Sequence, residues 1–312
     1  MAARINADPY ENDPACWGHS LANLAEILLG CLDARGAKSL VEIGAYAGDL
    51  TRVLLDWAGA GASVVAIDPT PHERLIELSK ERSELELIQE PSHVALGRIE
   101  LPDAVIVDGD HNYYTVSEEL RLIDERAAGA QLPLLILHDV GWPHGRRDAY
   151  WNPEGIPDEE RQPTLERPFL FPGDLGVADT GMPMYAAAER EGGPRNGVLT
   201  ALEDYLDRRG DLHNAVLAPF FGLAVVWPDD APWAQAVAGF LKPWAHHPVL
   251  ERLEANRVYH LALGHRRSQK LKRATAALEA QREENARLRR QVEEVVSEVE
   301  RLRSQPSRHG TS

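Results

Sequence analysis

The strongest constraint on the fold is an alternation of short aliphatic runs and helical segments in the first half of the chain. The aliphatic runs, which predict strands, cover residues 39–43, 62–67, 104–107 and 132–137, with a weaker run at 85–89. The segments with helical spacing of apolar residues cover 17–35, 49–57, 74–82 and 116–128. Continuous Val, Ile and Leu runs separated by helices are typical of a parallel sheet covered on both faces. The sequence therefore predicts an α/β fold with a Rossmann-like doubly wound sheet.

Two later aliphatic runs predict an antiparallel end to this sheet. Residues 215–218 and 223–227 follow a predicted helix at 197–209 and are joined only by residues 219–222. A joint this short connects antiparallel strands. We therefore expect a mostly parallel sheet with an antiparallel last strand, and then a helical region over 233–263 that is broken by prolines.

Residues 140–195 interrupt the alternation. These 56 residues contain 8 of the 21 prolines and 8 of the 24 glycines, and we expect no regular elements in them. The side chains of interest are Trp142, Arg146, Arg147, Tyr150 and Trp151. A connection of this length is either a functional lid or a disordered insert. As a lid, its aromatic rings would stack on a sugar or an aromatic ring and its arginines would meet an acidic acceptor group; alternatively, these side chains only anchor the loop.

The segment 266–304 has a seven-residue repeat. The a positions are Leu271, Leu278, Asn285, Val292 and Val299, and the d positions are Ala274, Gln281, Leu288, Val295 and Leu302. This repeat predicts a coiled coil through residues 271–303. An Asn at one a position favours a parallel dimer, because its amide pairs with its twin across the axis. The alternative is a single amphipathic helix that folds back on the body.

The charges of the two flanking positions support the dimer. Glu284 would face Arg289 of a second copy, and Glu298 would face Arg303, so both pairs attract. We therefore expect a homodimer. The Pro- and Ser-containing residues 305–312 predict a disordered tail.

The charge of the body argues against a nucleic acid as the main partner. Residues 266–312 contain 12 basic and 7 acidic side chains, whereas the preceding 265 residues contain 21 basic and 42 acidic ones. Phosphate binding needs clustered Lys and Arg, and the one basic cluster, at 265–273, is more simply a solvated helix face. The chain has no apolar run of about 18 residues and a polar start, so we expect a cytoplasmic protein without membrane contact. Cys16 and Cys31 receive no role.

The turn after the first strand contains two glycines at a fixed spacing from an acidic residue. Residues 42–48 read Glu-Ile-Gly-Ala-Tyr-Ala-Gly, so Tyr46 stands where a dinucleotide-binding turn has its second glycine. The pattern E-x-G-x-x-x-G resembles motif I of class I S-adenosylmethionine-dependent methyltransferases. The resemblance implies that the glycines let the chain pass close to the donor's amino acid part and that Glu42 binds its ammonium indirectly or through water. Asp68, at the end of the second strand, would take both ribose hydroxyls.

The cofactor-binding residues that we predict are Glu42, Gly44, Tyr46, Gly48, Asp68 and Asp108. Two alternatives remain open at this point. Glu42 would be a surface or capping acid, and Asp68 would cap the helix that follows Pro69.

Acids and imidazoles follow the next two strands. The fourth strand ends in Asp108-Gly-Asp-His111, and the fifth ends in His138-Asp139. Carboxyl ends of parallel strands share one edge of the sheet, so these side chains should converge there. The arrangement resembles the metal-dependent O-methyltransferases, which implies Asp108, His138 and Asp139 as metal ligands. Magnesium prefers oxygen, so either the metal is softer, or only the two carboxylates bind it, or none is used.

A closer likeness is to a bacterial methyltransferase family with the motifs D-G-D-H-x-Y and L-H-D-V, whose genes often lie beside genes for saccharides and natural products. It covers residues 36–227. Methyl transfer needs a base for the acceptor hydroxyl, and an imidazole suits that task. We predict His111 as this base, with His138 as the alternative and with Asp110 or Asp139 orienting the ring. In a purely structural interpretation, His111 caps the next helix and His138 is a packed polar residue.

Together these patterns predict an S-adenosylmethionine-dependent O-methyltransferase that acts on a hydroxyl of a saccharide or secondary metabolite, with magnesium or another divalent metal as an option. A metal-dependent hydroxylase-type enzyme on the same fold and a non-catalytic coiled-coil scaffold are the rivals. The predicted organisation is a helical segment at 1–35, a methyltransferase domain at 36–265 containing the 140–195 insert, the coiled coil at 266–304, and the tail.

Overall fold

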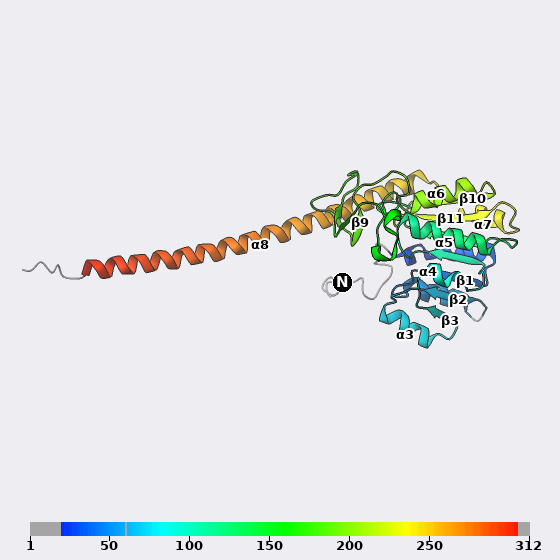
Figure 1. Ribbon diagram of the computed structural model, residues 1–312, viewed down its shortest axis with the longest axis horizontal. Coiled ribbons are helices and arrows are strands. Elements are labelled where there is room, and N and C mark those ends of the chain that lie inside the picture. Colours follow the sequence, from blue (N-terminus) through cyan, green and yellow to red (C-terminus); the bar gives the residue numbers. More distant parts are fainter. Residues whose placement is uncertain (1–19, 60, 305–312) are drawn as a thin grey trace, which may run out of the picture.

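The central sheet contains seven strands in the order β10-β11-β5-β4-β1-β2-β3 (Figure 1). The computed structural model describes residues 20–59 and 61–304. The strands are β1 Ser39–Ile43, β2 Ser63–Ile67, β3 Leu85–Ile88, β4 Ala104–Val107, β5 Leu134–His138, β10 Leu212–Leu217 and β11 Leu223–Pro228. Strands β1 to β5 are parallel, and β11 is antiparallel to both β5 and β10. The prediction of a mostly parallel, Rossmann-like sheet with an antiparallel end is confirmed.

Helices cover both faces of this sheet, as in a doubly wound fold. They are η3 Leu21–Leu24, α1 Ala25–Arg35, α2 Asp49–Ala58, α3 Glu73–Glu81, α4 Ser92–Ala95, α5 Tyr113–Arg126, α6 Val198–Arg208, α7 Ala234–Leu241 and α8 Pro248–Ser304. Leu40 and Val64 pack with α1, α2, α3 and α7, whereas Val41 and Val105 pack with α4, α5 and α6. Neighbouring residues of one strand thus enter opposite layers, which explains why the aliphatic runs are continuous.

Two helix boundaries differ from the prediction. Helix α5 begins at Tyr113, three residues before the expected start, because the side chain of Asn112 accepts the backbone N–H of Thr115 at 2.8 Å and caps the helix there. The N-terminal helix is divided into η3 and α1. It ends at Arg35, as predicted, and Gly36 follows in the left-handed conformation. Residues 17–19 of that predicted helix, Cys16 and the predicted tail lie outside the described residues.

The prediction of no regular elements in residues 140–195 is wrong. Two short helices, η4 Pro153–Gly155 and η5 Asp158–Glu160, and four short strands order this insert. The strands are β6 Thr164–Glu166, β7 Phe169–Leu170, β8 Met182–Pro183 and β9 Ala186–Ala188, which pair as β6-β9 and β7-β8. Each strand is too short to give a two-residue periodicity in the sequence. The insert is therefore an ordered subdomain.

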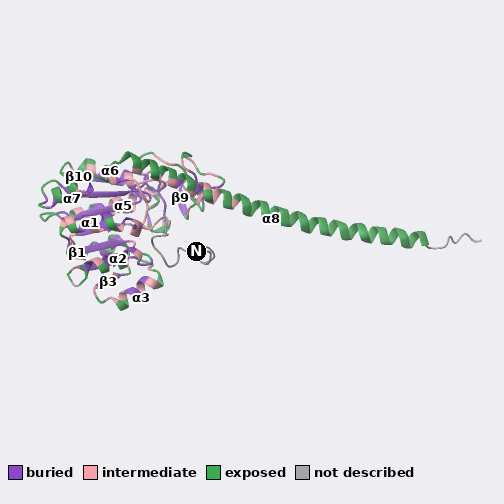
Figure 2. Cartoon of the chain, turned by 180° about the vertical axis from the view of Figure 1, so that it is seen from behind, coloured by how far each residue is buried: buried purple, intermediate pink, exposed green. Residues whose placement is uncertain are grey.

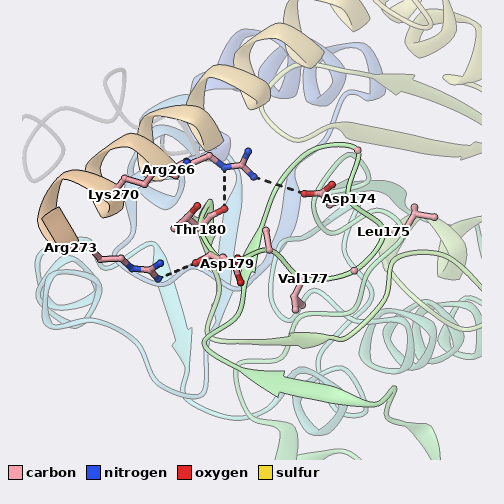
Figure 3. Close-up of a pocket in the computed structure, with 11 residues that line it drawn as sticks. Asp174, Leu175, Val177, Asp179, Thr180, Arg266, Lys270 and Arg273 are labelled. Carbon is pink, nitrogen blue, oxygen red and sulfur yellow. Dashed lines mark hydrogen bonds and ion pairs between the residues drawn. The ribbon is translucent and has the colours of Figure 1, made fainter.

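The first part of α8 is attached to this insert. The side-chain amide of Gln269 donates to the carbonyl of Gly181 and accepts its N–H, both at 2.9 Å. Arg266 and Arg273 donate to the carbonyls of Thr180 and Asp179 (Figure 3). These contacts tie the loop at 173–181 to the helix before it leaves the body.

Beyond Arg273, α8 projects from the body as a single helix (Figures 1 and 2). Every residue from 271 to 304 is exposed, including Leu271 at 69 % and Val295 at 63 %. The alternative of a helix folded back on the body is therefore wrong. The helix is continuous through 265–266, so the predicted boundary between domain and coiled coil lies inside it. Among the described residues, no helix combines the length and apolar character needed to cross a membrane.

Candidate functional site

The turns after β1 and β4 touch at the carboxyl edge of the sheet. The N–H of Asp108 donates to the carbonyl of Ile43 at 2.9 Å, and a Cβ added at Gly44 would lie 2.1 Å from the carbonyl oxygen of Asp108. Gly44 also has φ +85°, a conformation that side chains disfavour. Glycine is thus required here, and the contact brings the predicted donor turn beside the predicted catalytic loop.

The carboxylate of Asp68 is hydrogen-bonded to the turn after β1 and to the residues after β2. One carboxylate oxygen accepts the N–H of Tyr46 and the other accepts the N–H of Thr70, each at 2.8 Å. Each oxygen has two lone pairs, so the carboxylate keeps acceptor capacity for the two hydroxyls of a ribose. The side chain of His72, not that of Asp68, caps α3, so the interpretation of Asp68 as a helix cap is wrong. Tyr46 itself has φ +41° and is 58 % exposed, which leaves its ring at the surface of the turn.

Glu42 is buried rather than a surface acid. Its carboxyl accepts the hydroxyl of Thr51 at 2.6 Å, and only 2 % of the residue is exposed. Burial raises the pKa of Glu42 to about 8, the Thr51 hydrogen bond opposes this shift, and the negative charges of Asp108 and Asp68 add to it. Thr51 was not singled out from the sequence, since its role depends on α2 packing against β1.

His138 links the ends of β4 and β5. Its Nδ1 lies 2.9 Å from a carboxylate oxygen of Asp108 and 3.6 Å from one of Asp139, and its Nε2 lies 2.7 Å from the carbonyl oxygen of Phe220. Burial alone would lower the pKa of His138, but the two carboxylates and the hydrogen bonds raise it to about 10. The ring is thus a buried cation that donates from both nitrogens.

This geometry bears on the metal site that the resemblance implies. Asp108, His138 and Asp139 can each offer one ligand atom, and these atoms lie within 4.8 Å of one another. The Phe220 carbonyl occupies Nε2, as a backbone partner often does for a ligating imidazole, so only Nδ1 could face a metal. That nitrogen now donates to Asp108, and a metal would have to replace its proton.

His111 and Asp139 form a second imidazole–carboxylate pair. Nδ1 of His111 lies 3.3 Å from a carboxylate oxygen of Asp139, and the His111 side chain is 19 % exposed. Asp139 has φ +59°, a strained backbone conformation for a residue with a side chain. Asn112, not His111, caps α5, so the structural interpretation of His111 as a helix cap is wrong.

His144 is a site residue that sequence reasoning missed. Its ring lies 4.5 Å from that of His111, centroid to centroid, and the residue is 9 % exposed. Burial lowers the pKa of His144 to about 3, so the ring is neutral. We call Asp108, His111, His138, Asp139 and His144 the strand-end cluster. The only sequence signal for His144 is an imidazole shortly after the fifth strand.

The insert is hydrogen-bonded to the loop after β4 and to the first residues of two helices. Asp110 accepts the N–H of Trp151 at 3.0 Å, so this predicted catalytic acid contacts the insert and not the ring of His111. The carboxylate of Asp148 accepts the N–H groups of Tyr113 and Gly197 and the hydroxyl of Tyr150. These bonds join the insert to the N-termini of α5 and α6.

Arg146 and Arg147 bind groups of the protein itself, as in the interpretation in which they anchor the loop. Arg147 is 1 % exposed and donates to the carbonyls of Leu175, Gly176 and Ala188. Arg146 pairs with Glu203 on the surface of α6. Trp151 differs from both arginines, since it is 58 % exposed and its ring lies 4.6 Å from that of the exposed Tyr185.

Comparison with known families identifies the enzyme class. Residues 41–140 match a family model described as a methyltransferase domain. The chain is a methyltransferase. This agrees with the class predicted from the sequence, and the matched segment contains every predicted cofactor-binding, catalytic and metal-ligating residue.

Two solved structures illustrate how distant the related folds are. The SAH-bound methyltransferase PaMTH1 of Podospora anserina is 15% identical, with a TM-score of 0.44 over 71% of this chain and 84% of that one. A methyltransferase from Geobacter sulfurreducens is 14% identical, with a TM-score of 0.40 over 73% of this chain and 88% of that one. These likenesses are too distant to bear on activity. No curated protein matches the sequence.

Proposed function

We propose that the protein transfers the methyl group of S-adenosylmethionine to a hydroxyl group of a saccharide or secondary metabolite. One observation carries this proposal: the His111–Asp139 pair lies at the same sheet edge as the glycine turn, within the methyltransferase domain. A donor-binding turn and an imidazole base side by side are what methyl transfer to oxygen requires.

The donor would lie across the turn after β1. Asp68 has lone pairs left for the ribose hydroxyls, and the glycines at 44 and 48 let the backbone approach the methionine part. Glu42 would act through Thr51 and water, because its carboxyl is covered. Tyr46, at the exposed tip of the turn, would contact the donor with its ring.

His111 would take the acceptor proton. Nδ1 of His111 lies 3.3 Å from a carboxylate oxygen of Asp139. This carboxylate would favour the tautomer with its proton on Nδ1, which leaves Nε2 as the nitrogen that receives the acceptor proton. The acceptor oxygen attacks the methyl carbon in line with the carbon–sulfur bond, the sulfur leaves with the bonding electrons, and the hydroxyl proton passes to Nε2. The His138 cation, beside Asp108 and Asp139, would stabilise negative charge that develops on the oxygen.

A divalent metal held by Asp108, His138 and Asp139, as the resemblance implies, would stabilise the same charge. The steps above use the side chains alone, because both nitrogens of His138 already face oxygen acceptors. Asp110 would act indirectly by positioning the insert.

The acceptor would meet the exposed ring pair of Trp151 and Tyr185. The backbone N–H of Trp151 donates to Asp110, next in sequence to His111, so the backbone that carries Trp151 lies near the loop of the proposed base. Exposed aromatic faces suit stacking on a sugar or a planar natural product. This supports the proposed acceptor class.

We also propose that two copies pair as a parallel coiled coil over residues 271–303. The apolar a and d side chains are exposed along this length and nothing in the described body covers them. The parallel arrangement places Glu284 opposite Arg289 and Glu298 opposite Arg303, whereas an antiparallel one would place the Arg-rich flank of each helix against its own twin. A homodimer follows.

The test of the methyl transfer is incubation with methyl-labelled S-adenosylmethionine and a panel of saccharides and phenolic or polyketide alcohols. The proposal predicts labelled ether products with the wild-type chain and a loss of label with His111→Ala. Label on nitrogen or carbon acceptors alone would contradict the oxygen assignment, and oxidation of an acceptor with iron and dioxygen would favour the hydroxylase rival.

A further inference from the structure

His144 is a buried imidazole that the proposed reaction does not use. Its Nδ1 is buried and has no hydrogen-bond partner among the described residues. A tight turn fixes its position: the N–H of Gly145 donates to the carbonyl of Gly141, and the carbonyl of His144 accepts the N–H of Val198 at the start of α6. An orphaned buried nitrogen is costly, so its retention needs an explanation.

The neighbours of His144 supply a ligand set. One ring nitrogen of His111, one of His144 and one carboxylate oxygen of Asp139 all lie within 4.8 Å of one another. The three side chains come from the loop after β4 and the turn after β5, both held by backbone hydrogen bonds. This set differs from the one that the resemblance implies, since only Asp139 belongs to both.

The kinds of ligand atom in this set determine which cation it would bind. Two imidazoles and one carboxylate suit Zn²⁺, Co²⁺ or Fe²⁺, whereas Mg²⁺ prefers oxygen ligands. A neutral imidazole with an unused lone pair, such as His144, needs no rearrangement of protein hydrogen bonds before it binds a metal.

We propose that His111, Asp139 and His144 bind a divalent transition metal of the Zn²⁺ class and that this metal inhibits methyl transfer. The inhibition rests on the proposed function, in which His111 is the base, but the binding does not. If the metal takes Nε2 of His111, no lone pair remains for the acceptor proton. If it takes Nδ1, the ring proton moves to Nε2, which then donates and cannot accept. Either way the base is lost.

Binding is tested with Co²⁺ alone, followed by its visible absorption bands on the full chain. The wild type should bind one Co²⁺ per chain, and His144→Phe should weaken binding more than about tenfold. His144→Asn repeats the test should the Phe variant not fold, which circular dichroism reports. His260→Phe removes an exposed imidazole elsewhere on the chain and should bind like the wild type.

Equal Co²⁺ binding by the wild type and both His144 variants would overturn the site, because it would place the metal at Asp108, His138 and Asp139 or elsewhere. Absence of Co²⁺ binding by the wild type would overturn it as well. Neither result depends on turnover, so a failure of the proposed function does not affect this test.

Inhibition is tested by adding Zn²⁺ to chelator-treated enzyme during methyl transfer. The turnover of each protein is expressed relative to its own turnover with chelator. The wild type should lose this relative turnover as Zn²⁺ rises, and His144→Phe should keep it at the same Zn²⁺ concentrations, because the variant lacks one of the three proposed ligands. Activation of the wild type by Zn²⁺ or Fe²⁺ would overturn the inhibitory role. Equal inhibition of both proteins would show that Zn²⁺ acts through other residues.

Discussion

The strand-end cluster and the distal part of α8 break the usual distribution of side chains in opposite ways. In the cluster, His138, Asp139 and His144 are polar yet at least nine-tenths buried. On α8, residues 271–304 carry leucines and valines at regular spacing, all of them exposed. Scattered exposed apolar side chains are ordinary, whereas buried polar groups and continuous apolar stripes indicate a partner. The two regions therefore fit the two proposals made above, a ligand at the cluster and a second helix along α8.

The two regions also differ in how they are held. Each cluster residue is positioned by contacts between distant segments, such as His138 with Phe220 and Asp110 with Trp151. Apart from Arg273, which donates to the carbonyl of Asp179, the distal helix is held by its own backbone and by exposed i,i+3 pairs such as Glu284 with Arg287, which contribute little to stability. The exposed apolar side chains of the distal helix would be covered by the proposed pairing, whereas the cluster is already covered by its own chain.

The largest predicted effect concerns the cluster. His111→Ala should lower the rate of methyl transfer by about 10²–10⁴-fold, because the acceptor proton loses its base, while affinity for S-adenosylhomocysteine stays near that of the wild type. Turnover measured under saturating donor checks this. Wild-type turnover would move the role of the base to His138.

The next effect separates two adjacent valines on the distal helix. Val295→Glu places a charge at a d position and should convert the dimer into a monomer, whereas Val296→Glu, at the flanking e position, should leave the dimer intact. Light scattering across a concentration series measures both variants. A wild-type chain that is monomeric throughout, or variants that behave alike, would contradict the proposed pairing.

A smaller effect concerns the buried carboxyl of Glu119 on α5, which lies near Gly109 in the loop after β4. Burial raises the pKa of Glu119 from 4.5 to about 8. Its stabilising contribution is therefore fully present below pH 4.5 and is lost as pH rises through 8. Glu119→Gln should be more stable than the wild type by roughly 1–3 kcal/mol at pH 9 and about equal to it at pH 4. Denaturant unfolding at the two pH values checks this, and a difference that is the same at both would refute the assignment.

The smallest predicted effect concerns the contact between α8 and the insert. Gln269→Ala removes both hydrogen bonds between α8 and Gly181, so amide hydrogens of residues 178–183 should exchange faster while the cluster remains protected. Exchange followed by mass spectrometry measures the change. Unchanged protection would mean that the arginine contacts of Arg266 and Arg273 hold the loop without the glutamine.

The sequence predicts what depends on local pattern and misses what depends on assembly. Strands such as β4, the antiparallel end and the convergence of Asp108 with His138 follow from periodicity and from where strands end. The roles of Thr51, His144 and the Phe220 carbonyl do not, because each arises where segments distant in sequence meet. The short strands of the insert escape prediction for the same reason, since β6 finds its partner in β9, across a 19-residue connection from Arg167 to Tyr185.

The central claim is that the sheet edge binds an adenosine-bearing methyl donor, and calorimetric titration with S-adenosylhomocysteine tests it most directly. Wild-type chain should bind one molecule, Asp68→Ala should bind it at least about tenfold more weakly through loss of the ribose contacts, and the exposed control Asp56→Ala should bind like the wild type. Absence of heat with the wild type, or equal affinity for Asp68→Ala and the wild type, would contradict the claim.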